Sequence, residues 1–275
     1  MSLLEVSELE VTFPGGVHAV AGVSFAVQAG RVLAVVGESG SGKSVTSLAV
    51  MRLLRGALIG GSVRFDGIDV LEAEERVVRS LRGDRMAMVF QDSLSSLNPY
   101  YPVAFQIAEA YRAHRRVNRR AAREVAIGML ERVGIPEPGR RARDYPHQFS
   151  GGMRQRVMIA MALCLEPDLL IADEPTTALD VTVQAQILEL IDDLRRESGT
   201  AVLLITHDMG VVAGMADDIA VLRSGRLVES GTAHEVFHQP RAAYTQALLA
   251  CVPRLDGPLP RRLPTVPAVP EGEAL

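Results

Sequence analysis

Apolar residues along this chain follow two different spacings, which divide it into strands and helices. Strand-like segments rich in apolar residues occur at 31–36, 62–65, 86–90, 169–172, 201–205 and 219–222. Helical patterns separate several of them, as a mostly parallel sheet requires. Residues 3–36 are expected to be strands joined by turns at Gly15-Gly16 and Ala29-Gly30. The pattern therefore predicts an α/β fold around a mostly parallel sheet.

Helical spacing replaces the strand pattern between Asp92 and Glu166. Helices are expected at 103–114, 119–133 and 151–165. One apolar stripe consists of Ala122, Val125, Ala126, Met129, Leu130 and Val133. We interpret this stretch as a helical subdomain inserted into the sheet domain. The chain is then expected to have four parts, at 1–91, 92–166, 167–238 and 239–275. The last part should be a helix and a poorly packed tail, because prolines recur from Pro253 to Pro270.

The segment Gly37–Ser44 matches the phosphate-binding pattern G-x-x-x-x-G-K-[ST]. It lies between an apolar strand and a helix expected from Lys43 to Leu54. The apolar face of that helix is expected to contain Val45, Leu48, Ala49 and Leu53. Glycines allow backbone N–H groups to turn toward an anion, and a helix N-terminus favours negative charge. Lys43 is expected to reach the β- and γ-phosphates, and the Ser44 hydroxyl to bind Mg²⁺. The alternative is a glycine-rich turn that only joins the strand to the helix.

Two carboxylates, Asp173 and Glu174, follow the apolar strand at 169–172. In P-loop folds an acid at such a strand end acts on Mg²⁺, usually through water. A second acid beside it is placed to accept a proton from attacking water. The alternative is a helix N-cap or a solvated turn, since Pro175 follows.

Three further polar groups lie at the ends of elements. His207 could donate a hydrogen bond to a γ-phosphate or hold the attacking water; the alternative is a helix cap or a satisfied loop histidine. Gln91 offers an amide that could touch metal and water. Ser150-Gly151-Gly152 opens an apolar helix and, taken alone, could be an ordinary serine N-cap. Open α/β sheets bind ligands at the C-terminal ends of their strands, so the strand-end groups should converge on one crevice. These groups are Gly37–Ser44, Gln91, Asp173-Glu174 and His207.

Composition narrows the function classes. A net charge of −4 gives no general case for nucleic-acid binding. The first residues lack the pattern of a secretory signal, and the longest fully apolar run, Val157–Leu165, is too short to cross a bilayer. Cys164 and Cys251 have no CxxC spacing, which favours a reducing compartment, and Cys164 is expected to be buried. Any association with a membrane is therefore expected to depend on a partner protein or on the surface of this protein.

The motifs, in this order, resemble the ATP-binding subunits of ABC transporters over residues 3–252. They correspond to Walker A (Gly37–Ser44), the Q-loop (Gln91), the signature (Phe149–Met153), Walker B (Leu169–Glu174), the D-loop (Ala178–Asp180) and the H-switch (His207). The resemblance implies a P-loop NTPase (RecA-like) core with a mostly parallel sheet. It also implies an antiparallel β N-terminal part and an inserted α-helical subdomain.

More narrowly, the chain resembles the ATPases of oligopeptide/dipeptide/nickel importers. The segments that carry this resemblance are Gln91–Pro99, Tyr145–Met153, Ala172–Thr182 and Tyr244–Leu249. Some relatives carry a cysteine-rich iron–sulfur motif near the C-terminus, which Cys251 alone cannot build. The resemblance implies ATP hydrolysis that powers uptake of peptides or a related small solute through partner permeases. The alternatives are a non-transport ABC ATPase and a P-loop kinase.

The resemblance also implies roles for single residues. Glu174 would be the general base, and His207 would contact γ-phosphate and water. Ser44 and Gln91 would bind Mg²⁺, on which Asp173 acts through water. Phe13 would stack on adenine, unless it is an ordinary strand aromatic. The residues expected to contact ATP are Phe13, Gly37, Glu38, Ser39, Gly40, Ser41, Gly42, Lys43, Ser44, Val45, Ser150, Gly151, Gly152 and Asp180.

The resemblance implies three kinds of partner: a second ABC ATPase subunit, two transmembrane permeases and an extracytoplasmic solute-binding protein. The second ATPase is expected to be a paralogue, so that the pair is a heterodimer, and nucleic acid is not expected to be a partner. Two ATPs would lie between head-to-tail subunits, with Asp180 communicating across the dimer and Gln91 linking the site to the helical subdomain. The subunit would be peripheral, on the cytoplasmic side of the cell (inner) membrane. One basic run is either a solvated helix face or a contact for anionic lipid. It contains Arg112, Arg115, Arg116, Arg119, Arg120 and Arg123.

Overall fold

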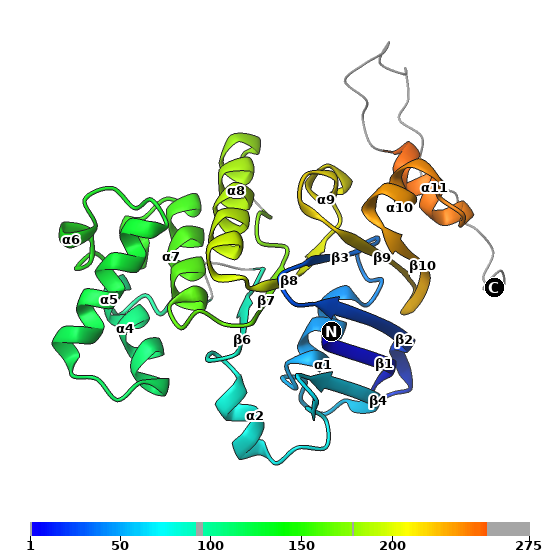
Figure 1. The fold of residues 1–275 in the computed structure, drawn as a ribbon, viewed down its shortest axis with the longest axis horizontal. Coiled ribbons are helices and arrows are strands. Elements are labelled where there is room, and N and C mark those ends of the chain that lie inside the picture. The colour runs from blue at the N-terminus through cyan, green and yellow to red at the C-terminus, as the bar shows by residue number, and fades with distance from the viewer. Residues whose placement is uncertain (1, 92–95, 178, 252–275) are drawn as a thin grey trace, which may run out of the picture. The chain divides into compact units, whose positions relative to one another are not determined.

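The computed structural model describes residues 2–91, 96–177 and 179–251 and has an α/β fold (Figure 1). Ala178 of the predicted D-loop and the proline-rich tail after Cys251 lie outside these residues. The described strands form two sheets: one of four in the order β2-β1-β4-β5, and one of six that is mixed and mostly parallel. By its internal contacts the chain divides into two units. The first contains residues 28–30 and 72–203, and the second contains residues 2–27, 31–71 and 204–251.

The second unit contains the four-stranded sheet. Its strands are β1 (Ser2–Phe13), β2 (Val17–Gln28), β4 (Leu58–Phe65) and β5 (Ile68–Asp69). β1 pairs antiparallel with β4, with a register shift between Ser7 and Glu10, and β4 pairs antiparallel with β5. This sheet agrees with the antiparallel N-terminal part that the family resemblance implied.

The rest of the second unit surrounds strand β3 (Val32–Val36), all of whose residues are buried. β3 lies parallel to β9 (Asp218–Arg223), which pairs antiparallel with β10 (Arg226–Thr232). Burial of the whole of β3 is expected of an interior strand and explains its unbroken apolar run. The helices of this unit are α1 (Lys43–Val50), α9 (Met209–Met215), α10 (Ala233–His238) and α11 (Ala243–Ala250).

The first unit contains the parallel pair β6 (Met86–Val89) and β7 (Leu169–Asp173) and most of the helices. Strand β8 (Ala201–Thr206) begins in this unit and ends in the other. The helices are α2 (Glu75–Leu81), α4 (Val103–His114), α5 (Arg119–Arg132), α6 (Pro138–Arg141), the 3₁₀ helix η1 (Pro146–Gln148), α7 (Gly151–Leu163) and α8 (Val181–Ser198). From residue 96 to 166 every regular element of the described chain is helical, as the periodicity predicts. The division into four parts stays a prediction.

The first helix after the glycine-rich loop is shorter than expected. It ends at Val50, because Met51 caps it and Arg52 adopts the left-handed conformation with φ 51°. Its buried side chains include Thr46, Ala49 and Val50, whereas Leu53 is 38% exposed. Of the predicted apolar face, Ala49 is buried and Val45 and Leu48 are partly buried, so the prediction is wrong for Leu53, which lies beyond the end of the helix. On α5, by contrast, five of the six residues of the predicted stripe are buried and Val125 is partly buried.

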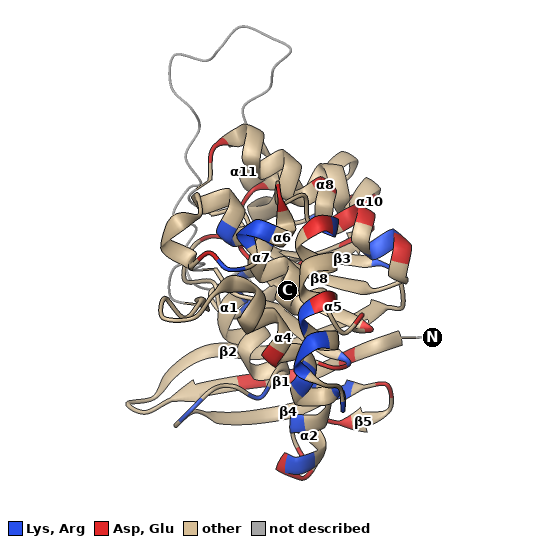
Figure 2. Ribbon diagram, turned by 90° about the vertical axis from the view of Figure 1, so that its left-hand side faces the viewer, with Lys and Arg blue, Asp and Glu red and all other residues tan. Residues whose placement is uncertain are grey.

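The basic run does not form one helix face. Arg112 lies on α4, Arg115 lies in the connection, and Arg119 begins α5. Acidic groups pair with several of these arginines, including Asp84 with Arg115 at 2.7 Å and Glu124 with Arg120 at 3.1 Å. Figure 2 shows acidic residues among the basic ones along these helices. Contact with anionic lipid stays a prediction.

Candidate functional site

Lys43, in the glycine-rich loop Gly37–Ser44, is buried and held by the loop itself. The loop follows β3, and Lys43 begins α1. Although its side chain is charged, Lys43 is only 5% exposed. Its Nζ donates to the carbonyl oxygens of Gly37 at 2.7 Å and Glu38 at 2.8 Å. A buried ammonium needs such acceptors. The contacts fix the amine beside the loop, where a phosphate could add to its partners.

Two glycines of the loop occupy positions that no other residue could fill without displacement. Gly37 has φ 153°, and a Cβ on it would lie 2.1 Å from the carbonyl oxygen of Leu222. Gly42 has φ 98°, and a Cβ there would lie 2.5 Å from the carbonyl oxygen of Ala19. Because Gly42 is the N-cap of α1 and has no side chain, the first N–H groups of the helix are not capped from that position. Such N–H groups suit an anion.

The outside of the loop is fastened by residues that are distant in sequence. The N–H of Gly225, in the β9–β10 turn, donates to the carbonyl oxygen of Ser41 at 3.0 Å. The Tyr244 hydroxyl on α11 accepts the N–H of Glu38 at 3.1 Å. The loop is thus held between β3, the β9–β10 turn and α11, all within the second unit.

His207 and Phe13 belong to the same unit. His207 follows β8 and is exposed. Its neighbour Asp208 caps α9 by accepting the N–H of Gly210 at 2.8 Å, and the N–H of Asp208 donates to Thr206 Oγ1 at 3.0 Å. The cap considered as the alternative role for His207 is therefore made by Asp208. Phe13 ends β1 and is partly buried.

In the first unit, the register of two strands brings Gln91 and Glu174 together. Val89 of β6 lies opposite Ala172 of β7, so the two strands end at the same edge of the sheet, and Gln91 and Glu174 follow just beyond these ends. Gln91 Nε2 donates to Glu174 Oε2 at 2.8 Å. This contact confirms that these two strand-end groups lie side by side, as the sheet-edge argument expects.

Glu174 is held in an uncommon backbone conformation. Its φ is 46°, in the left-handed region, which costs free energy for a residue with a side chain. Thr177 Oγ1 donates to Glu174 Oε2 at 2.8 Å, and the N–H of Thr177 donates to the Glu174 carbonyl at 3.2 Å. Asp173, at the end of β7, is 5% exposed. Glu174 is therefore fixed by its turn and by Gln91, while Asp173 is buried beside it.

The Ser150-Gly151-Gly152 segment forms the start of α7. Ser150 is the N-cap, and its Oγ accepts the N–H of Met153 at 3.3 Å, so the helix begins at Gly151, as the sequence predicts. A Cβ on Gly152 would lie 2.5 Å from Cγ1 of Val183 on α8. Asp180 caps α8 by accepting the N–H of Val183 at 3.0 Å. Each of these residues thus has a role within its own chain, and their contacts with ATP stay predictions.

Sequence reasoning missed three residues of these clusters. Tyr244 lay in a family motif but had no assigned role, and nothing local indicates that it reaches Glu38. Thr177 follows Glu174 by three residues, which is the spacing of a tight turn and could have suggested the contact. Gly225, with φ 77°, lies in a Ser-Gly turn, and this dipeptide indicates a turn but not its contact with the loop. Convergence of the strand ends of both units on one crevice stays a prediction.

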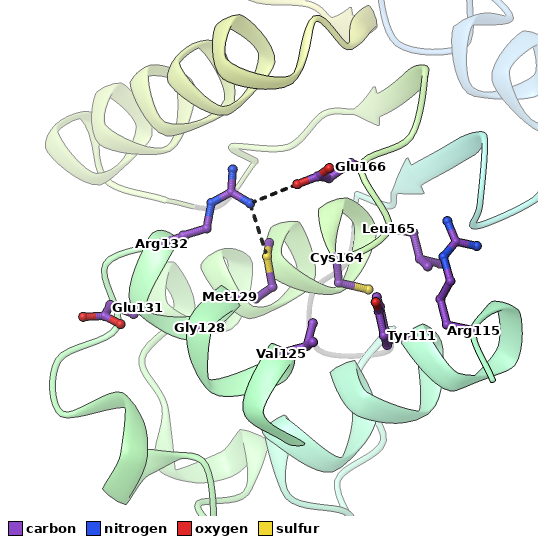
Figure 3. A pocket seen from close by; sticks show the side chains of 10 residues that line it. All are labelled: Tyr111, Arg115, Val125, Gly128, Met129, Glu131, Arg132, Cys164, Leu165 and Glu166. Atoms are coloured by element: carbon purple, nitrogen blue, oxygen red, sulfur yellow. Dashed lines mark hydrogen bonds and ion pairs between the residues drawn. The ribbon is translucent and has the colours of Figure 1, made fainter. Parts of the chain in front are cut away.

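A cavity of about 540 Å³ lies among α4, α5 and the end of α7, and none of the predicted site residues lines it (Figure 3). Cys164 and Tyr111 lie on its wall, and Arg132 pairs across it with Glu166 at 3.7 Å. Burial raises the pKa of the Cys164 thiol to about 11. At neutral pH this thiol is protonated and therefore a weak nucleophile, in agreement with the predicted buried apolar role.

The chain matches two protein families. Residues 20–177 match the ABC transporter family, and residues 228–273 match the C-terminal region of oligopeptide/dipeptide transporters. It is 49% identical to the oligopeptide transport ATP-binding protein OppD of Bacillus subtilis (strain 168), over 98% of this chain and 76% of that protein. It is 50% identical to the dipeptide transport ATP-binding protein DppD of the same strain, over 92% and 78%. Against OppD of Salmonella typhimurium (strain LT2) the identity is 52%, over 92% and 77%.

Solved structures of ATP-binding cassettes share the fold. One is a dimeric, post-hydrolysis cassette bound to ADP and Pi, with a TM-score of 0.75 and 27% identity over 84% of this chain and 98% of that one. Another is cbiO1 of Clostridium perfringens, part of an ABC transporter complex, with a TM-score of 0.74 and 28% identity over 86% and 91%. Over the described part of the chain, no helix has the length and apolar character of a membrane span. The likeness extends over both units and the C-terminal region, and the chain belongs to the ABC transporter ATPases, in the branch of the oligopeptide and dipeptide transport ATP-binding proteins.

Proposed function

We propose that this chain is the ATP-hydrolysing subunit of an ABC importer that takes up di- or oligopeptides or a related small solute through partner permeases. The observation that carries the proposal is the hydrogen bond of Gln91 to Glu174 just beyond the ends of two adjacent strands, in a chain whose glycine-rich loop also holds Lys43. The named transport substrates of the relatives support the peptide class. The match of residues 228–273 to the transporter C-terminal region supports the same branch.

The proposed chemistry uses Glu174 as general base. Gln91 and Thr177 both donate to its Oε2, which holds the carboxylate in one orientation. A carboxylate fixed in this way can accept a proton from water as the water attacks the γ-phosphate, and such help is typically worth about 10²–10⁴ in rate. His207 would contact γ-phosphate and water. Lys43 would bind the phosphates while keeping its bonds to the loop carbonyls.

The side-chain oxygen atoms of the proposed metal-binding residues are of the kind that binds Mg²⁺. Ser44 offers a hydroxyl, Gln91 an amide oxygen and Asp173 a carboxylate, and hard oxygen ligands are what this ion prefers. Because the Gln91 side-chain amide donates to Glu174 through its nitrogen, its oxygen can bind a metal ion or a water molecule. When bound, Mg²⁺ would neutralise charge on the phosphates. Asp173 would act on the ion through water.

We further propose that two such subunits share each ATP. The Gly37–Ser44 loop of one subunit and Ser150-Gly151-Gly152 of the other would hold the nucleotide, with Asp180 near the shared boundary. The dimeric cassette among the solved structures supports this arrangement. The second subunit would be a paralogue, and the pair would lie against the cytoplasmic face of the cell membrane.

A surface of the helical region suits a permease. Tyr100, Tyr101 and Phe105 are 83%, 47% and 44% exposed, and the last two rings stack at 4.9 Å. Exposed aromatic side chains that cluster in this way favour a binding surface. Phe105 also lines a groove of about 270 Å³, whose other lining residues are Pro102, three alanines, four arginines and Glu109. It would accept the apolar face of a permease helix that carries an acidic residue.

The test is co-purification and uptake. Expressed with its permeases and binding protein, the chain should purify as a complex whose ATPase activity rises with peptide-loaded binding protein. Uptake of a labelled dipeptide or tripeptide should stop in Lys43→Ala. A chain that hydrolyses ATP but never associates with permeases would instead be a non-transport ABC ATPase.

A further inference from the structure

A tyrosine of the C-terminal region contacts the phosphate-binding loop directly. Tyr244 lies on α11, within the segment that matches the transporter C-terminal region. It is 3% exposed, and its hydroxyl accepts the N–H of Glu38 at 3.1 Å. A phenol buried to this extent normally has a hydrogen-bond partner, and here the partner is loop backbone.

The contact fixes the peptide on which Lys43 depends. The N–H of Glu38 and the C=O of Gly37 belong to one peptide unit, which is planar and trans, so the two groups point in opposite directions. Tyr244 holds the N–H, and Lys43 Nζ holds the C=O at 2.7 Å. Rotation of this peptide would move the carbonyl away from Lys43. Tyr244 therefore prevents the rotation from the side opposite the amine.

The ring of Tyr244 is itself held in place. The Arg223 guanidinium lies over it, 4.9 Å from the ring centre, which adds a cation–π contact. The ring belongs to a buried cluster with Val36, the last residue of β3, and Val221 of β9. The hydroxyl is thus carried by a side chain with little freedom, which lowers the entropy cost of its hydrogen bond.

Helix α11 is positioned by a carboxylate of β10. Its N-cap, Ala242, makes no side-chain cap, and Glu229 instead binds the backbone at the N-cap and just before it. Glu229 accepts the N–H groups of Arg241 at 2.8 Å and Ala242 at 3.0 Å. Burial alone would raise the pKa of Glu229, but the neighbouring Thr245 hydroxyl and these N–H groups outweigh it and lower the pKa. The place of Tyr244 therefore depends on β10 and the start of α11.

We propose that Tyr244 is a positioning residue for nucleotide binding, which acts through the Gly37–Glu38 peptide and Lys43. Through it, the affinity for nucleotide depends on where the C-terminal region holds α11. The inference rests on the proposed role of Gly37–Ser44 as the ATP site. Without the hydroxyl, the peptide samples other orientations, and the fraction of loops able to bind nucleotide falls in proportion.

The experiment measures the Kd for MgADP by titration calorimetry on the full chain, together with thermal unfolding of the nucleotide-free protein. Tyr244→Phe keeps the ring and the Arg223 contact but removes the hydroxyl. Its Kd should rise about 3- to 10-fold, the range expected for loss of one buried hydrogen bond. Tyr111→Phe, which removes a hydroxyl on α4, is the matched control and should leave the Kd unchanged. Glu229→Gln should also raise the Kd, because it weakens the contacts that position α11. It provides a second test should Tyr244→Phe fold poorly.

Lys43→Ala separates this inference from the proposed site. Loss of MgADP binding in Lys43→Ala, with a raised Kd in Tyr244→Phe, supports both. Loss of binding in Lys43→Ala with an unchanged Kd in Tyr244→Phe and Glu229→Gln overturns the positioning role and leaves the site standing. Unchanged binding in Lys43→Ala overturns the site itself. In the assembled transporter Tyr244→Phe should raise the KM for ATP with little change in kcat. A lower unfolding temperature without a change in KM would mean that Tyr244 is only structural.

Discussion

Replacing Gly152 by alanine tests whether this glycine serves packing within its own chain or the approach of a second subunit's nucleotide. A Cβ at position 152 would lie 2.5 Å from Cγ1 of Val183, closer than atoms normally approach. The branched Val183 side chain on α8 has one strongly preferred rotamer in a helix, so turning away would cost free energy. We expect overpacking to lower the free energy of unfolding by about 1–3 kcal/mol, offset by up to about 1 kcal/mol because alanine favours helix over glycine.

The assay is urea unfolding of the single and double variants. Val183→Ala removes the obstructing methyl, so Gly152→Ala/Val183→Ala should show a coupling energy of about 1–3 kcal/mol in favour of the double variant. Gly128→Ala is the matched control, because a Cβ at this helical glycine would meet no atom within 4 Å. It should be neutral or slightly stabilising. If Gly152→Ala is as stable as the parent, or if Val183→Ala gives no relief, the packing argument is wrong.

ATPase activity of the assembled transporter then distinguishes the two roles. If the double variant recovers both stability and hydrolysis, Gly152 is needed only for packing against α8. If it recovers stability while hydrolysis stays low, the added methyl obstructs something outside the chain. The shared-ATP arrangement predicts the second result, because the glycine would face the nucleotide bound to the partner.

Three further outcomes are expected. Glu229→Gln should lower stability at neutral pH by about 1–2 kcal/mol. The pKa of Glu229 in the folded chain lies below its ordinary value of 4.5, so the stability difference between parent and variant should be complete above pH 4.5 and should shrink as acid protonates the carboxyl. Unfolding scans at several pH values measure this difference, and a difference that stays constant with pH would contradict the prediction. The pKa of the Cys164 thiol is about 11, against an ordinary value of 9.0. Cys164 should therefore react with iodoacetamide at least about 100-fold more slowly in the folded chain than in urea, as measured by mass spectrometry. Equal rates would show that the thiol is accessible in the folded chain. Asp180→Ala should lose about 1 kcal/mol of stability with its N-cap, whereas Asp180→Asn should keep it; equal losses in unfolding would rule out the cap.

Residues that act through local spacing could be predicted from the sequence. The glycine-rich loop, the strand ends with Gln91 and Glu174, and the helices of residues 96–166 follow from apolar periodicity and short motifs. Local patterns are informative there because the parallel strands have simple buried runs and the loop needs glycine at fixed positions. The closeness of Gln91 and Glu174 also follows, once β6 and β7 are taken as neighbours that end at the same edge.

Contacts between distant segments could not be predicted in this way. Tyr244 and Glu38 are separated by 206 positions, and no periodicity connects them. The clash that excludes a side chain at Gly152 depends on the placement of α8. The arginine run looked like one basic face, but a turn divides it and acidic partners such as Asp84 come from elsewhere in the chain. Helix α1 is shorter than predicted because the left-handed Arg52 follows its end, and Leu53 therefore lies outside the helix.

The sharing of each ATP by two ATPase subunits is tested most directly by the Glu174→Gln variant. Its mass in solution is measured by light scattering with and without MgATP, alone and mixed with the partner ATPase, beside its rate of hydrolysis. The account predicts hydrolysis at least about 100-fold slower, with a dimer that forms only when MgATP is present. A variant that stays monomeric with MgATP in both preparations and hydrolyses at the parent rate would contradict it.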